Sequence, residues 1–203
     1  GTTALDGQVS YTSSGLGESW AVVRAGSGGG TLDGDVTGLT RSAWILASSD
    51  VANPWHEIVR LVLLFDTGTI PSSATIISAR LRFVVNAKGN SFSGSIVVVA
   101  STPASNTTLV GTDYNQVGAT ALSATVTIAS LIADDASYTS ISLNLLGLAQ
   151  ITKGGITKLG IRIESDRSNV EPTWSSLGQD IVTIRASEAV ATQRPILEVT
   201  YQV

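Results

Sequence analysis

Few residues of this sequence could perform acid–base chemistry. His56 is the only histidine, and Glu57 follows it directly. A histidine and a carboxylate can together move protons in catalysis, but the chain contains no Gly-x-Ser-x-Gly nucleophile motif. A glycosidase would need two carboxylates about 5–9.5 Å apart in one cleft, whereas most of the 16 acidic residues fall in predicted turns. We therefore expect no enzymatic activity.

Two groups of polar residues could bind a hard cation. Asp33 and Asp35 lie in a glycine-rich segment, and Asp166, Asn169 and Glu171 follow a predicted strand. Calcium is bound by carboxylate and carbonyl oxygens on loops, although neither group has the spacing of an EF-hand. The alternative interpretation is that these residues are solvated loop side chains. Calcium is thus the one cofactor that the sequence leaves open, because the absence of cysteine excludes thiolate metal sites and disulfides.

Tryptophan faces could stack on sugar rings or anchor a protein partner. Trp20 and Trp44 fall in strand patterns and are expected in the core, whereas Trp55 and Trp174 fall in predicted loops next to prolines. For Trp174, packing over one end of the fold is the alternative to a role in recognition. The predicted residues for binding a carbohydrate or a partner are Trp174, Trp55, Glu171, Ser175 and Gln179.

The central element that must position these side chains is the segment 57–85, which predicts two strands joined by a structured loop. Apolar residues alternate along each strand, which is typical of a strand with one buried face. The residues on these faces are Val59, Leu61, Leu63 and Phe65, followed by Ile77, Ala79, Leu81, Phe83 and Val85. Arg60, Arg80 and Arg82 fall on the opposite faces, where we expect them to face solvent.

Strand-like patterns also occur on both sides of this pair. They cover residues 8–12, 19–24, 42–48, 96–101, 124–129, 139–145, 157–164, 181–185 and 196–201. Residues 145–151 are the best helix candidate, residues 88–90 predict a turn, and residues 165–178 predict a long loop of the kind that carries binding surfaces. About ten strands with one or two short helices, and no alternation of strand and helix, predict an all-β fold. We expect an antiparallel two-sheet β-sandwich, jelly-roll-like.

We find no repeat or linker, which predicts a single domain over residues 1–203. Residues 1–7 would be a flexible or partner-contacting lead, and the glycine-rich loop 26–38 a second contact segment. Mean hydropathy is +0.27, yet no run approaches the roughly 18 apolar residues of a membrane span, so no membrane insertion is expected. A net charge of −4 without a basic cluster argues against nucleic acid as a partner.

The segment 60–81 carries a family resemblance. Its pattern, R-x-x-x-L-F-D-T-x-x-I-P-x-x-A-x-I-x-x-A-x-L, resembles the central motif of disaggregatase-related (DNRLRE) β-sandwich domains. Residues 143–174 and 194–201 resemble the second half and the closing strand of the same family. The resemblance implies a jelly-roll fold similar to that of carbohydrate-binding modules, in secreted or cell-surface proteins. It also extends to predicted structural proteins of tailed phages.

From these observations we expect a non-enzymatic structural or adhesive module on a virion surface or in the extracellular space. It would be a phage decoration, fibre or tail component, with further copies or other surface proteins as partners. The alternative is a carbohydrate-binding module of a secreted or cell-surface protein, with a glycan as partner. A third alternative is an extracellular filament subunit whose N-terminal segment adds a strand to a neighbour's sheet. The sequence leaves the host, the glycan and the oligomeric state open.

Overall fold

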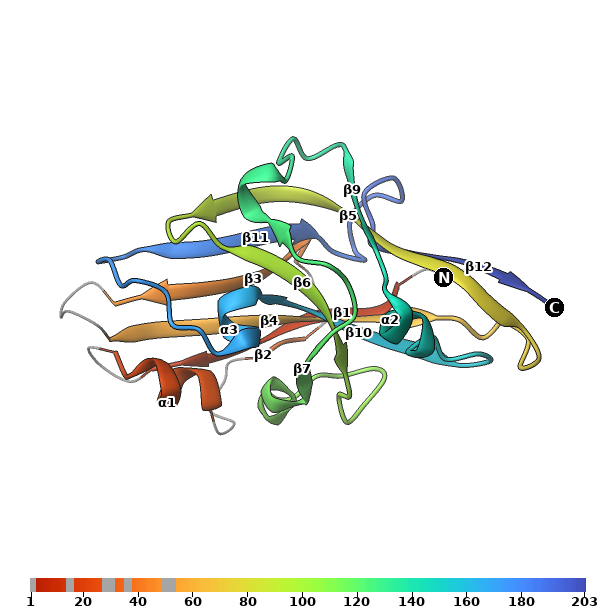
Figure 1. The fold of residues 1–203 in the computed structure, drawn as a ribbon, viewed down its shortest axis with the longest axis horizontal. Helices are drawn as coiled ribbons and strands as arrows, with labels where there is room; N and C mark the ends of the chain where they lie inside the picture. Colours follow the sequence, from red (N-terminus) through yellow and green to blue (C-terminus); the bar gives the residue numbers. More distant parts are fainter. Residues whose placement is uncertain (1–2, 14–16, 27–31, 35–37, 49–53) are drawn as a thin grey trace.

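The computed structural model describes residues 3–13, 17–26, 32–34, 38–48 and 54–203 (Figure 1). Within these ranges the strands are β1 (Thr3–Thr12), β2 (Leu32–Gly34), β3 (Thr40–Ala47), β4 (Trp55–Asp66), β5 (Thr75–Asn90), β6 (Ser95–Ser101), β7 (Val117–Ala121), β8 (Val126–Thr127), β9 (Tyr138–Ser142), β10 (Ile156–Ile163), β11 (Gln179–Arg185) and β12 (Ile196–Gln202). The helices are α1 (Trp20–Ala25), α2 (Leu145–Ala149) and α3 (Glu164–Ser168), with 3₁₀ turns η1 (Gly111–Gln116) and η2 (Ile128–Ser130). All strand pairs between these elements are antiparallel, which confirms the predicted all-β antiparallel class.

The described strands form one hydrogen-bonded sheet that forks twice. Its main path runs β12-β5-β11-β3-β4-β10-β6-β7. One side of β4 pairs with β1, while the other side pairs first with β3, up to Val59, and then with β10 from Leu61 onward. Likewise, β5 pairs with β12 over residues 75–82 and with β11 over residues 85–90. Figure 1 shows β5 as a long strand that runs beside both. Strands that change partner in this way let a sheet turn a corner.

Both faces of β4 are buried, from Ile58 through Phe65. The prediction of a half-buried strand is therefore wrong for β4, because a strand covered on both sides reads as a nearly continuous apolar run. The prediction is confirmed for most of β5, where Ala79, Leu81 and Phe83 are buried. Of the five residues predicted on the buried face of β5, only Ile77, near its start, is exposed, to 53%.

Three local predictions are wrong. Residues 124–129 predicted a strand, but β8 covers only Val126–Thr127 and the 3₁₀ turn η2 begins at Ile128. Residues 19–24 predicted a strand, but α1 forms there with Trp20 and Val23 buried, a spacing of three that places both on one helix face. The helix ends at Gly26, where an added methyl group would lie 2.8 Å from the Tyr11 ring. Residues 88–90 predicted a turn, but β5 continues to Asn90 because β11 pairs with it there.

Both expected contact segments pair within the chain where they are described. Residues 3–7 belong to β1 and pair with β4. Residues 32–34 form β2 and pair with β1, while residues 1–2, 27–31 and 35–37 lie outside the described residues. The predicted helix is confirmed as α2, and the predicted long loop begins instead with α3. Within the described ranges we find no helix with the length and apolar character that crossing a membrane requires.

Candidate functional site

A cavity of about 340 Å³ lies where the β5–β6 connection, α3 and the start of β11 meet. We call it the Phe92 pocket. Its walls combine an aromatic ring, two small apolar side chains, four serines and two carboxylates. The lining residues are Phe92, Ser93, Gly94, Ser95, Glu164, Ser165, Ser168, Val170, Pro172 and Asp180.

Asp180 is the most distinctive group in this pocket, because it is only 1% exposed and no described cationic side chain pairs with it. Its Oδ1 accepts a hydrogen bond of 2.9 Å from the Phe92 amide. Its Oδ2 and the Ser165 hydroxyl oxygen are buried and lack a hydrogen-bond partner among the described residues. Burial raises the pKa of the Asp180 carboxyl, and the nearby amides of Phe92 and Gly94 only partly oppose this. Two polar atoms of pocket-lining residues are thus buried without a hydrogen-bond partner among the described side chains, which is costly in free energy.

Gly94 is required beside this carboxylate. A methyl group added at Gly94 would lie 1.9 Å from Asp180 Oδ2, so any larger residue at this position would have to displace the Asp180 carboxylate. The short turn through Gly94 therefore lets the backbone approach Asp180 closely.

Phe92 belongs to a cluster of three aromatic rings that contact one another at tilted or edge-on angles. Its ring centroid lies 5.5 Å from that of Trp55, which in turn lies 4.9 Å from that of Trp20. The Trp55 indole N–H donates a 2.7 Å hydrogen bond to Glu171 Oε1. Trp55 is fully buried, so it supports the pocket from behind and offers no face to a ligand.

A second hollow, of about 420 Å³, adjoins the first. It is lined by Glu171, Pro172, Thr173 and Trp174, and Pro172 lines both. Trp174 is half-buried, packs against the core and donates its indole N–H to Pro54 O at 2.8 Å. We refer to the two hollows together as the groove.

The structure brings some of the predicted binding residues together and not others. Trp174 and Glu171 line one hollow, whereas Ser175 and Gln179 are exposed and line neither hollow. Sequence reasoning missed Phe92 and Asp180. The signal for Phe92 was present, since an aromatic residue flanked by serines and a glycine between two strands is typical of an exposed turn.

Of the residues predicted for calcium, Asp166, Asn169 and Glu171 have described side chains, and each has another structural role. Both carboxylate oxygens of Asp166 bind arginines, Asn169 ends α3 in a left-handed conformation (φ 60°), and Glu171 binds Trp55. Asp35 and the side chain of Asp33 lie outside the described residues. Among the side chains that are described, we find no group of three or more metal-binding residues.

His56 and Glu57 also take separate partners. Ser13 Oγ lies 3.4 Å from His56 Nδ1. The Glu57 carboxylate accepts hydrogen bonds from the Thr12 hydroxyl at 2.8 Å and from the Trp44 indole N–H at 3.0 Å. The two neighbours in sequence thus take different hydrogen-bond partners.

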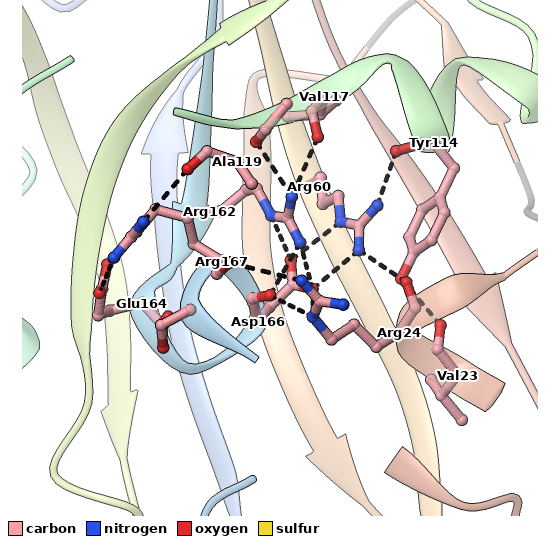
Figure 2. A network of polar contacts seen from close by, with 12 residues as sticks. Val23, Arg24, Arg60, Tyr114, Val117, Ala119, Arg162, Glu164, Asp166 and Arg167 are labelled. Carbon is pink, nitrogen blue, oxygen red and sulfur yellow. Dashed lines mark hydrogen bonds and ion pairs between the residues drawn. The ribbon is translucent and has the colours of Figure 1, made fainter. Parts of the chain in front are cut away.

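A second polar cluster, the arginine network, surrounds Asp166 (Figure 2). Arg60 donates to the two Asp166 carboxylate oxygens at 2.8 and 2.9 Å, and Arg162 donates to the same two atoms at 2.6 and 2.7 Å. One carboxylate therefore holds two guanidinium groups, each through a paired contact of the strong, charge-assisted kind. Burial raises the pKa of the Asp166 carboxyl, but the two guanidiniums outweigh it and the pKa lies below its ordinary value.

The prediction that Arg60 faces solvent is wrong, because this side chain is 3% exposed. Arg60 stands where β4 changes partner from β3 to β10, and α3 brings Asp166 to that point. The guanidinium also donates to Tyr114 O at 2.8 Å and lies 3.7 Å from the centre of the Tyr114 ring. Arg80 and Arg82 instead lie on the surface, as predicted, and pair with Glu198.

A third buried carboxylate, Asp6, lies on β1. It accepts a hydrogen bond from the Ser187 amide, and Arg41 Nε lies 3.3 Å from its other oxygen. Burial raises the Asp6 pKa from 3.8 to about 6, more than Ser187 and Arg41 lower it.

We expect Asp6 to make stability fall as pH rises. Because its pKa is higher in the folded than in the unfolded chain, the native state binds the extra proton between pH 4 and 6. The stabilisation is complete below pH 4 and is lost as pH rises through about 6, by at most roughly 3 kcal/mol. Asp180 acts in the same direction, so urea denaturation of wild type and Asp6→Asn at several pH values should isolate Asp6. Parallel pH profiles for the two proteins would contradict this assignment.

The chain matches no known protein-family model, and a search of curated proteins finds no match. The resemblance to disaggregatase-related domains thus remains a prediction from the motif.

Proposed function

We propose that the protein is a non-enzymatic adhesive module, displayed on a virion surface or in the extracellular space, that binds a glycan in the groove. The observation that carries this proposal is the pair of unpartnered buried oxygens, Asp180 Oδ2 and Ser165 Oγ, beside the Phe92 ring. A sugar ring has an apolar face that packs on an aromatic side chain and hydroxyl groups that need hydrogen-bond partners. The Phe92 pocket supplies both kinds of contact within one cavity.

The dimensions of the groove fit this assignment. The two hollows have volumes of about 340 and 420 Å³, within the range of roughly 300–1,000 Å³ for small-ligand sites. A saccharide bound at Phe92 could continue past Pro172 toward Trp174. The groove therefore suits a short oligosaccharide.

We also propose that the forked sheet closes into two facing layers, as in a jelly-roll-like sandwich. The burial of β4 on both faces supports this, since the sheet must then be covered on both sides. The partner changes along β4 and β5 supply the corners that such a closure requires.

A structural subunit that binds another copy or a surface protein is the second candidate. Exposed apolar side chains at the start of β5 and on α2 favour it, namely Ile77, Leu145 (84% exposed) and Leu146. These segments are neighbours, because the Leu143 amide, just before α2, donates to Ala79 O on β5 at 2.9 Å. Exposed apolar clusters commonly mark interaction surfaces. The filament alternative gains less support, since β1 already pairs with β4 of the same chain.

Glycan-array binding of wild type and variants tests the first proposal. Asp180→Asn keeps the shape but removes the charged acceptor, and Phe92→Ala removes the aromatic face. Each should weaken binding by about tenfold or more. Trp174→Ala should weaken the binding of longer oligosaccharides more than the binding of monosaccharides. Asp134→Asn, at an exposed aspartate outside the groove, is the matched control and should bind like wild type.

Sedimentation of the same proteins distinguishes the second candidate. Absence of glycan binding, together with an oligomer that the double change Leu145→Ser and Leu146→Ser converts to monomers, would reject the groove. It would instead assign the exposed apolar end as the functional surface.

A further inference from the structure

The arginine network borders a third pocket, on a different face of α3 from the groove. Glu164, Ser165 and Ser168 of α3 line the Phe92 pocket, whereas Asp166 points into the network (Figure 2). The Arg167 side chain points away from the network, to Glu164 and Ala119 O. The third pocket has a volume of about 250 Å³. Its polar lining is cationic and amide in character, with no acidic side chain among the described lining residues, and includes Arg24, Arg60, Asn115 and Arg162.

The network carries more positive than negative charge. Arg24, Arg60 and Arg162 all contact Asp166, which supplies one negative charge against three positive ones. The neighbouring Glu164 is already paired with Arg167 at 2.5 Å and adds nothing to this balance. Burial lowers the pKa of Arg162, and the nearby positive charges of Arg60 and Arg24 lower it further against the effect of Asp166. The three arginines and Asp166 thus leave an excess of two positive charges. Such an excess at a largely buried position costs free energy unless other groups offset it.

Backbone carbonyls offset part of this charge at the two inner arginines. Arg162 Nη1 donates to Val117 O and Gly118 O at 3.1 and 3.0 Å. With its contacts to Asp166, all five of the Arg162 N–H groups are engaged. Arg60 uses four of its five, with the carbonyl oxygens of Tyr114 and Arg24 as its other partners.

Arg24 differs, since it retains free hydrogen-bonding capacity. Its Nε donates to Asp166 O at 2.6 Å and its Nη2 lies 3.5 Å from Arg167 O. Its Nη1 donates to no described residue, and the side chain is 25% exposed at the mouth of the pocket. The Arg24 guanidinium is fixed through Nε and Nη2, and its Nη1 remains open. The planar guanidinium group matches the geometry of an oxyanion.

We propose that this pocket binds an oxyanionic group, the carboxylate of an acidic sugar or an inorganic sulfate or phosphate. Arg24 provides the open guanidinium edge. Arg60 and Asn115 line the same pocket, and one N–H of the Asn115 amide donates to Gly26 O. A bound anion reduces the excess positive charge of the network. This site is separate from the groove, and its occupancy is independent of glycan binding there.

Melting curves in sodium sulfate and in sodium chloride of equal ionic strength test the proposal. Sulfate stabilises many proteins without binding a defined site, so wild type is compared with Arg24→Gln. The control is Arg194→Gln, at an exposed arginine whose Nε also donates to a backbone carbonyl. We expect a saturable rise in melting temperature of a few degrees in wild type and Arg194→Gln, on top of a general, non-saturating sulfate effect, and only that general effect in Arg24→Gln. Arg24→Lys, which keeps the charge but not the planar edge, should bind about tenfold more weakly.

Calorimetric titration with glucuronate, glucose, sulfate and phosphate distinguishes the source of the anion. Binding of glucuronate but not glucose assigns a sugar carboxylate, and binding of sulfate or phosphate alone assigns an inorganic anion. Asp180→Asn should retain either response, which separates this site from the groove. If wild type and Arg24→Gln respond equally to every anion, the proposal is rejected.

Discussion

Replacement of Asp166 by asparagine should lower the free energy of unfolding by about 3–5 kcal/mol. The carboxylate is 1% exposed and holds Arg60 and Arg162 through four hydrogen bonds. Asparagine offers one acceptor oxygen and no charge, so both guanidiniums would remain buried without a counter-charge. Such a loss of one partner costs far more than the intact pair contributes, because the desolvated charge has no alternative partner.

Urea denaturation at pH 7 measures this effect. Asp134→Asn is the control, since this exposed aspartate accepts hydrogen bonds only within its own turn. The pKa of Asp166 is lowered, so its contribution is present above the ordinary value of 3.8 and is lost as pH falls through the lower folded value. The difference between wild type and Asp166→Asn should therefore narrow in strong acid. A loss below about 1 kcal/mol at pH 7 would contradict the role given to the network.

Replacement of Phe83 by alanine should cost about 3–5 kcal/mol. Phe83 is fully buried on the inner face of β5, between Leu81 and Val85. Truncation removes the buried ring and leaves a cavity that close-packed neighbours fill only in part.

The control for Phe83 lies in the same strand. Ile77 is exposed, so Ile77→Ala should cost less than about 1 kcal/mol. Chemical denaturation should show a lower midpoint for Phe83→Ala with an unchanged denaturant slope. Equal costs for the two substitutions would mean that the inner face of β5 has been assigned incorrectly.

Strand positions were largely predictable from the sequence, because apolar alternation is local. The pattern in residues 75–85 locates β5 and its inner face, and the helix pattern near Leu145 locates α2. The pattern of residues 19–24 did not locate α1, because Trp20 and two valines favour a strand locally and tertiary packing decided otherwise.

The candidate sites were less predictable, because their parts are distant in sequence. Arg60 and Asp166 are separated by 106 residues, and Phe92 and Asp180 by 88. From the sequence alone, a charged residue in an apolar strand is expected to face solvent. A buried position such as that of Arg60 can be expected only when its partner of opposite charge is known. Trp55 was assigned to a loop because Pro54 precedes it, but it begins β4 and packs against the rings of Trp20 and Phe92.

The separation of Arg60 from Asp166 also constrains the order in which the chain can fold. During synthesis, β4 emerges from the ribosome about a hundred residues before its counter-charge in α3. Until α3 forms, the Arg60 guanidinium opposes burial of this very apolar strand in any compact intermediate. The same charge hinders pairing of β4 with strands of other chains, as charged gatekeeper residues do. Completion of the core is thus tied to the C-terminal half, and Arg60 opposes aggregation of β4 until that half is made.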